Sequence, residues 1–306
     1  MKHLLNKSSI CFFVLCGLFL LIILSTNLNL QRLFANSFEN NTALNDTHSS
    51  YAFTLDLFAE LVEDRIRGII DILEFTSKDK TFSTISYLSN ITDAYHGIAS
   101  NLETDKRQVL DYILKINPDI ASIYFVLPNG DIYLGEPYRH QEQLPRLNFA
   151  DREWYVGVTT LNETYVSSIF LSASINAPAF AIAVPVSTNS DVESPTLNSG
   201  EVPFGYLVGI VNLKLVHDLV SNVTSNNIGD FFVIDKNGTQ LFNSSDTGIT
   251  DNLKKFHYIE GISYNTTQLV NANHTVISEL NNTLLLSKPI AFKNGHLIAI
   301  LVTENK

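Results

Sequence analysis

The order of apolar and polar residues divides the chain into a helical part and a strand-rich part. From Tyr51, apolar residues recur at spacings of three and four, which predicts one buried stripe on a long helix. The stripe consists of Leu55, Phe58, Val62, Ile66, Ile69 and Leu73. A second helix is predicted from Ser83 to Ile116, because Pro118 pushes Asn117 out of the helical region. Residues 51–118 are therefore expected to be helical.

From Ile120 the pattern becomes that of β-strands. Ala121–Leu127 is rich in β-formers, a Pro-Asn-Gly-Asp turn follows, and Asp131–Leu134 returns, so a hairpin is predicted. Residues 136–149 are predicted as a polar loop, and residues 188–203 as another. Further strands are predicted at Thr164–Leu171, Ala179–Ser187 and Phe204–Leu213, followed by a short helix at Lys214–Thr224.

The strand pattern then repeats. Three blocks match later blocks in the same order: Tyr124–Gly130 with Phe231–Gly238 (one insertion), Ala183–Val186 with Ser287–Ile290, and Gly205–Ile210 with Gly295–Ile300. The repeat predicts two copies of one module, residues 119–225 and 226–306. The expected fold is α+β: a long N-terminal helix followed by two tandem PAS-like antiparallel sheets, each with a pocket on one face.

The N-terminus predicts a membrane anchor. An uncharged stretch runs from Ser8 to Gln31, with two lysines before it, which orients residues 1–9 toward the cytoplasm. Residues 10–30 are long enough to span a bilayer, and residues 31–50 read as a polar linker. The alternative is a cleaved signal peptide, although bulky residues at 32–34 disfavour cleavage. A single-pass protein of the cell membrane is predicted, with most of the chain outside.

Composition limits the function classes. The formal charge is −11, from 20 Lys and Arg against 31 Asp and Glu, which argues against a nucleic-acid partner. Both cysteines, Cys11 and Cys16, lie in the predicted anchor, so the exported part must be held by its core rather than by disulfides. Motifs of nucleophilic, phosphate-binding or metal-dependent enzymes are missing, and the histidines are scattered. No enzyme activity, metal or cofactor is expected.

Asn-x-Ser/Thr sequons are dense, which predicts a glycosylated outer surface and favours an archaeal cell-surface protein. They lie at Asn40, Asn45, Asn90, Asn162, Asn222, Asn237, Asn243, Asn265, Asn273 and Asn281.

The best candidate site is the segment from Asp151 to Tyr155. It holds the sole tryptophan, Trp154, and the last arginine, Arg152. Arginine offers a bidentate fork to a carboxylate, and Trp154 and Tyr155 supply apolar walls with polar handles. The alternative is that Trp154 only anchors the core.

Arg-x-Trp-Tyr between strand-rich blocks, in a duplicated PAS-like chain behind a long helix, resembles the double Cache (dCache) family of extracellular sensors over residues 51–303. The resemblance implies that Arg152 and Trp154 hold a ligand carboxylate and that Tyr155 lines the pocket. Three expected polar positions differ here, where Leu147, Phe170 and Asn212 replace two tyrosines and an aspartate. The second copy has no such motif between Asn243 and His274, so the site belongs to the first, membrane-distal module.

The predicted function is a membrane-anchored sensor that binds a small organic acid or neutral polar molecule rather than an α-amino acid, with Arg152, Trp154, Tyr155, Phe170 and Asn212 at the site. Because no output domain follows before Lys306, signalling through a partner membrane protein or a homodimer is expected. The alternative is a ligand-free structural or adhesive glycoprotein, in which Arg152 pairs with Asp151 or Glu136.

Overall fold

The computed structural model describes residues 47–186, 203–223, 228–245, 275–280 and 283–304. The chain divides between Leu57 and Phe58 into two compact units, and both β-sheets belong to the second. The predicted anchor at residues 10–30 lies outside the described residues. Among those that are described, no helix combines the length and the apolar character needed to cross a membrane.

The helical region differs from its prediction in one part. Helix α2 (Thr47–Ser77) includes the predicted stripe, and all six residues of the stripe are buried. The single helix predicted from Ser83 to Ile116 is wrong: the 3-10 turns η2 (Lys80–Ser83) and η3 (Leu88–Asn90) precede a shorter helix, α3 (Thr104–Ile116). Its first part cannot be helical, because His96, Gly97 and Glu103 all have positive φ.

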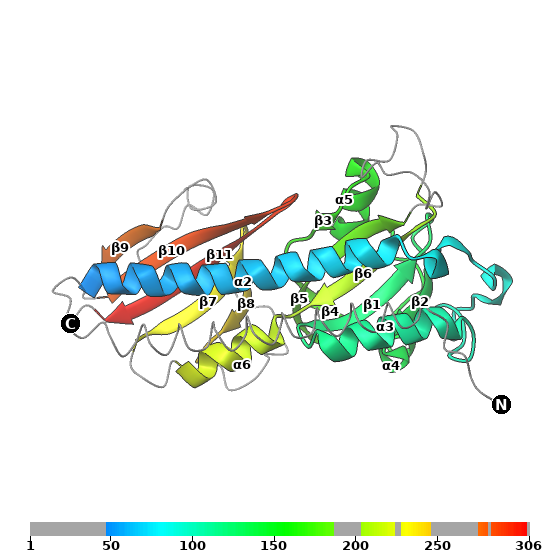
Figure 1. The fold of residues 1–306 in the computed structure, drawn as a ribbon, viewed down its shortest axis with the longest axis horizontal. Helices are drawn as coiled ribbons and strands as arrows, with labels where there is room; N and C mark the ends of the chain where they lie inside the picture. Colours follow the sequence, from blue (N-terminus) through cyan, green and yellow to red (C-terminus); the bar gives the residue numbers. More distant parts are fainter. Residues whose placement is uncertain (1–46, 187–202, 224–227, 246–274, 281–282, 305–306) are drawn as a thin grey trace, which may run out of the picture. The chain divides into compact units, whose positions relative to one another are not determined.

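The first sheet is antiparallel, with strand order β2-β1-β6-β5-β3, and β4 also pairs with β5 (Figure 1). Its elements are β1 (Ile120–Val126), β2 (Ile132–Glu136), α4 (Tyr138–Glu142), α5 (Glu153–Leu161), β3 (Tyr165–Val166), β4 (Phe170–Ser172), β5 (Ala177–Val186) and β6 (Gly205–Val211). Two predictions are corrected here. The loop predicted at residues 136–149 contains helix α4. The strand predicted at Thr164–Leu171 is split into β3 and β4, because Ile169 N–H donates to Asp235 rather than to β5.

The second sheet repeats the first. Helix α6 (Lys214–Val223) leads into β7 (Asp230–Asp235), β8 (Gln240–Asn243), β9 (Val276–Leu280), β10 (Thr283–Phe292) and β11 (Gly295–Glu304). The order β8-β7-β11-β10-β9 matches that of the first sheet: an outer hairpin, then the last strand of the copy, then the strand before it. The duplication read from the sequence is therefore present in the fold.

Strand register fixes which residues correspond. A bulge interrupts the first hairpin between Phe125 and Val126 and the second between Val233 and Ile234, so Tyr124 corresponds to Phe232 without an insertion. In the next strand pair, Pro185 lies opposite Tyr206, while Pro289 lies opposite Ile298. The third block of the repeat is thus shifted by two residues from the sequence match.

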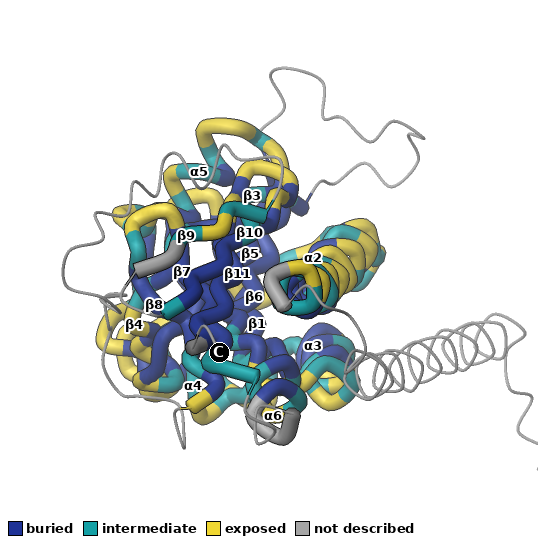
Figure 2. Tube along the Cα trace, turned by 90° about the vertical axis from the view of Figure 1, so that its left-hand side faces the viewer, coloured by how far each residue is buried: buried dark blue, intermediate teal, exposed yellow. Residues whose placement is uncertain are grey.

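The two faces of the first sheet are covered by different helices. Helix α3 packs on β1, and α2 passes so close to β6 that a Cβ added at Gly209 would lie 2.9 Å from Leu73. Helix α5 packs on β5 on the opposite face, where its residue Trp154 shares a core with Tyr206 of β6. The central strands of both sheets are buried along most of their length (Figure 2). The face under α5 is called the inner face below.

A short segment, Thr164–Phe170, joins the two sheets. The backbone N–H of Ile169 donates to Asp235 Oδ2 at 3.0 Å, and Asn294 Nδ2 donates to the carbonyl of Thr164 at 3.1 Å. Asp235 is 1 % exposed, and its other oxygen accepts from Asn237 N and Thr239 N in its own hairpin turn. A buried carboxylate of the second sheet therefore fixes the backbone that enters β4 of the first.

Candidate functional site

Helix α5 positions the Arg-x-Trp-Tyr residues. Arg152 is its N-cap, with an extended backbone and a carbonyl that accepts from Val156 N, and the helix ends at Asn162 in the left-handed region. A Cβ at Gly157 would meet the ring of Tyr165 at 2.5 Å, so glycine is what lets α5 lie directly against β3. The start of the helix, with the positive end of its dipole, therefore lies over the sheet at Arg152.

The guanidinium of Arg152 lies between two phenyl rings. Its central carbon is 6.0 Å from the centroid of Phe149 and 5.9 Å from that of Phe170, and the residue is half-buried. Within the part of the chain that the structure describes, no carboxylate lies within ion-pair distance of it. Asp151 pairs with Arg146, and Glu136 pairs with Arg107. The alternative pairing of Arg152 with either carboxylate is therefore wrong.

Trp154 and Tyr155 form an aromatic series that continues onto β6. Trp154 is 5 % exposed and belongs to the core of the inner face. Its ring contacts Tyr155 edge-on with centroids 6.0 Å apart, and Tyr155 contacts Tyr206 in the same manner at 5.8 Å. The hydroxyl of Tyr155 donates to Pro128 O at 2.5 Å. Burial raises the pKa of Tyr155, and raises that of Tyr206 to about 12, so both phenols are neutral at pH 7.

Glu153 does not neutralise Arg152, because its carboxylate is engaged elsewhere. One oxygen accepts from the hydroxyl of Tyr165 at 2.9 Å and from the N–H and hydroxyl of Ser168 at 3.2 and 3.1 Å. These bonds attach α5 to the Thr164–Phe170 segment.

Small residues occupy the middle of the inner face. Ala179, Ala181 and Ala183 alternate along β5, and all three are fully buried in the core that contains Trp154. Because alternate residues of a strand share one face, these methyl groups form a shallow floor beneath α5.

Phe170 and Asn212 lie at one end of this floor. Phe170 pairs with Ala179, and Phe180 pairs with Val211, so one step further along the same register places Asn212 beside Ala179. The side-chain oxygen of Asn212 accepts from Lys214 N at 3.2 Å, as a cap of α6. The side-chain NH₂ group of Asn212, which is a donor, takes no part in this capping bond. The structure thus brings Phe170 to Arg152, whereas it engages Asn212 in capping a helix.

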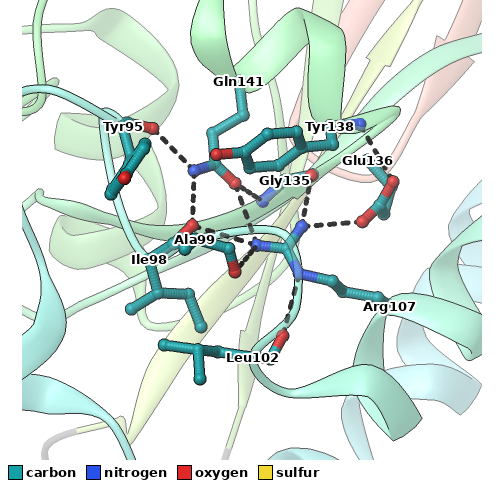
Figure 3. A network of polar contacts seen from close by, with 9 residues as sticks. All are labelled: Tyr95, Ile98, Ala99, Leu102, Arg107, Gly135, Glu136, Tyr138 and Gln141. Atoms are coloured by element: carbon teal, nitrogen blue, oxygen red, sulfur yellow. Dashed lines mark hydrogen bonds and ion pairs between the residues drawn. The ribbon is translucent and has the colours of Figure 1, made fainter.

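Sequence reasoning missed Arg107, a buried arginine with many hydrogen-bond partners. Arg107, on α3, is 6 % exposed and pairs with Glu136 at 2.7 Å (Figure 3). It also lies 5.1 Å from the ring of Tyr138 and donates to Leu102 O, Gly135 O, Ile98 O, Ala99 O and Gln141 Oε1. This network holds α4 against β2. No sequence signal distinguishes Arg107 from a surface arginine, because its partners come from three separate segments.

An open hollow lies beside the Arg152 group rather than in it. Its volume is about 610 Å³, and it is lined by Asp93, Asp131, Arg146, Leu147, Asn148, Ala150 and Asp151. Arg146 is already paired with Asp151 there, which leaves the lining acidic. Leu147 also packs against the inner core. Across the residues with described positions, no three His, Cys, Asp or Glu side chains gather as a metal site.

The sequons are only partly placed. Asn90 and Asn237 are exposed, and Asn162 and Asn243 are partly buried. The side chains of Asn40, Asn45, Asn222, Asn265, Asn273 and Asn281 lie outside the described residues. Glycosylation remains a prediction.

Solved structures share this architecture. The ligand-binding domain of the Pseudomonas aeruginosa chemoreceptor PctC, in complex with GABA, matches with a TM-score of 0.54 and 16 % identity, over 84 % of this chain and 100 % of that one. That of the Pseudomonas fluorescens chemoreceptor CtaA, in complex with L-isoleucine, matches with a TM-score of 0.53 and 12 % identity, over 81 % and 88 %. At these identities the likeness establishes the fold alone.

An extracellular ligand-binding receptor from Desulfohalobium retbaense matches with a TM-score of 0.60 and 12 % identity over 85 % of this chain. The present chain spans 41 % of that receptor. No curated protein matches the sequence. A family model described as Cache domain, dCache_1, matches residues 39–296, which is most of the chain and includes α5, the first sheet, and the second sheet as far as the start of β11. The chain therefore belongs to the Cache-domain family, in its double (dCache) form.

Proposed function

We propose that this protein is a membrane-anchored extracytoplasmic sensor that binds a small carboxylate at the inner face of its first sheet and passes the signal to a partner protein. One observation carries the proposal. Arg152 is a half-buried cation without a carboxylate partner among the described residues, held between Phe149 and Phe170 at the start of α5. Arg107 and Arg146, by contrast, are both paired with carboxylates.

The chemistry of the group suits a carboxylate. A guanidinium donates two parallel hydrogen bonds to a carboxylate, and the phenyl rings on either side limit the water that would compete for it. The aromatic series from Trp154 to Tyr206 and the alanines of β5 offer apolar surface to the rest of a small molecule. Binding rather than catalysis is proposed, and the anchor at residues 10–30 and the partner are parts of the proposal.

A thermal-shift screen of the purified full chain in detergent tests the proposal, with small organic acids, amines and amino acids as ligands. We expect at least one carboxylate to stabilise the protein. Arg152→Ala is expected to weaken the affinity for that carboxylate about 10- to 150-fold, since a charge-assisted hydrogen bond contributes about 1.5–3 kcal/mol. Arg146→Ala is the matched control: this arginine lies six positions earlier and is paired with Asp151 at the surface.

Two results would contradict the proposal. One is a screen in which no carboxylate stabilises the chain, and the other is a stabilisation that Arg152→Ala leaves intact. Either result would favour the ligand-free surface glycoprotein, in which Trp154 serves only as a core anchor.

A further inference from the structure

Five neutral polar side chains meet at one end of the inner face. They come from β1, α4, β4 and the β4–β5 turn, and are called the hydroxyl cluster: Ser122, Tyr124, His140, Ser172 and Ser174. Ser122 Oγ lies 2.7 Å from His140 Nδ1 and 3.5 Å from Ser174 Oγ, which in turn lies 3.0 Å from Ser172 Oγ. The cluster is deep, because Ser122, Ser172 and Tyr124 are 0, 2 and 4 % exposed.

The hydroxyl of Tyr124 has no hydrogen-bond partner among the described residues. Burial raises the pKa of Tyr124 to about 12. The hydroxyls of Ser174 and Ser122 lie near enough to offset part of this effect of burial. Neither makes a hydrogen bond of normal geometry with it. A buried hydroxyl without a partner costs about 1–3 kcal/mol, so a bound molecule that supplies one gains that interaction.

The hydroxyl cluster belongs to the same site as Arg152. Tyr124 pairs with Val208, which pairs with Ala183, so the tyrosine lies in a row with the alanine floor. On β4, Phe170 contacts Arg152 and Ser172 joins the cluster. These two residues alternate on one face of the strand, about 7 Å apart. One small molecule therefore has the length to reach both.

The second sheet shows that the fold does not need this hydroxyl. Phe232 occupies the position of Tyr124 there, in a sheet of the same strand order and register. An aromatic ring alone serves the packing, so the phenol oxygen in the first sheet is an addition with a different use.

The chemistry of the cluster selects a neutral partner. It contains no carboxylate, and burial lowers the pKa of His140, so its imidazole is neutral at pH 7. Beside Ala179, the side-chain oxygen of Asn212 already accepts a hydrogen bond from Lys214 N at the start of α6. A ligand ammonium would have no counter-charge among these groups, whereas a hydroxyl would find both donors and acceptors.

We infer that the hydroxyl cluster is the second half of the ligand site and hydrogen-bonds a neutral hydroxyl group of the molecule whose carboxylate Arg152 holds. The ligand class is thus a small hydroxy acid. The inference rests on the proposed function, since it takes the carboxylate contact with Arg152 as given.

The test uses matched probes on the full chain: C4–C6 acids whose hydroxyl is on the carbon farthest from the carboxylate, their amino counterparts with the amine at that carbon, and the plain carboxylic acids of the same skeleton, titrated by calorimetry. We expect the hydroxy acid to bind at least about tenfold more tightly than either analogue. Tyr124→Phe is expected to reduce its affinity about tenfold, to near that of the plain acid, without lowering the stability of the unliganded protein.

Tyr133→Phe is the control tyrosine. Its hydroxyl donates to Glu103 at 2.5 Å and accepts from Tyr87 N at 3.0 Å, so its loss is expected to reduce stability and leave affinity unchanged. The inference is overturned if plain or amino acids bind as tightly as hydroxy acids, or if Tyr124→Phe keeps full affinity because its hydroxyl holds only a water. In those cases carboxylate binding through Arg152 still stands. Absence of binding by every probe overturns both.

Discussion

The two sheets have one topology and register, yet their inner faces differ in content. At corresponding positions the first sheet has Tyr124, Val126, Ala181, Tyr206, Val208 and Ile210, while the second has Phe232, Ile234, Leu285, Ile298, Ile300 and Val302. Tyr124 and Tyr206 are both replaced by apolar residues in the second sheet, and Ala181 is replaced by a leucine. The first copy thus has smaller residues and two tyrosines on its inner face, whereas the second has larger apolar residues, with the buried Ser287 at the position of Ala183.

The largest effect is expected at the Arg107 network of the first sheet. Arg107→Met should reduce the free energy of unfolding by about 3–5 kcal/mol, because it leaves Glu136 without its buried partner. Urea unfolding followed by Trp154 fluorescence measures it, since the only tryptophan lies on the inner face of this sheet.

Lys115→Met is the control on the same helix. Lys115 pairs with Asp111 in solvent, with side chains 70 and 51 % exposed, so its removal should change stability by less than about 1 kcal/mol. Equal losses from both substitutions would show that the Arg107 network is no stronger than a surface pair.

A reciprocal exchange tests the difference in space between the inner faces. Leu285→Ala should cost about 2–5 kcal/mol, because it leaves a cavity in a filled core. Ala181→Leu should cost less than about 1 kcal/mol and should abolish carboxylate binding, because the leucine occupies the ligand space. Urea unfolding and calorimetry give the two readings. If Ala181→Leu is as costly as overpacking a closed core, about 1–3 kcal/mol, the contrast between the faces fails.

The smallest effect concerns pH. Burial, then the charge of Arg139, lowers the pKa of His140 below its usual 6.5. The unfolded chain therefore takes up a proton at a higher pH than the folded protein does. The contribution of His140 to stability is complete above pH 6.5 and declines as the pH falls from there toward the lowered folded pKa. Between pH 7.5 and pH 5.5, the free energy of unfolding should fall less for His140→Gln than for the natural chain. An equal fall in the variant and the natural chain would show that His140 is not the source of this pH dependence.

The sequence predicted the parts of the fold that periodicity and duplication encode. The stripe of α2 and the hairpin of β1 and β2 follow local rules of spacing, and the duplication of the module follows from matched blocks of sequence. The helix predicted from Ser83 failed because residues such as Leu88 and Tyr95 keep helical spacing, yet are 59 and 44 % exposed. Spacing alone does not show whether a stripe has a partner to cover it.

The site was predictable only in part, for the same reason. Arg152, Trp154 and Tyr155 are adjacent in sequence and carry a family resemblance, so they could be found. The hydroxyl cluster collects residues from β1, α4, β4 and the β4–β5 turn, and each of them is ordinary in its local context. The pairing of Glu136 with Arg107 rather than Arg152 depends on how α3 and β2 meet, which no short motif encodes.

The bond from Ile169 to Asp235 has a consequence for dividing the chain. If the second sheet were cut away, a buried N–H beside β4 would lose its acceptor; if the first sheet were cut away, Asp235 would lose one of its three donors. Each copy thus completes a hydrogen bond of the other. Although the two modules share one fold, they are no longer interchangeable. A fragment needs both modules to keep the hydrogen bond between Ile169 and Asp235.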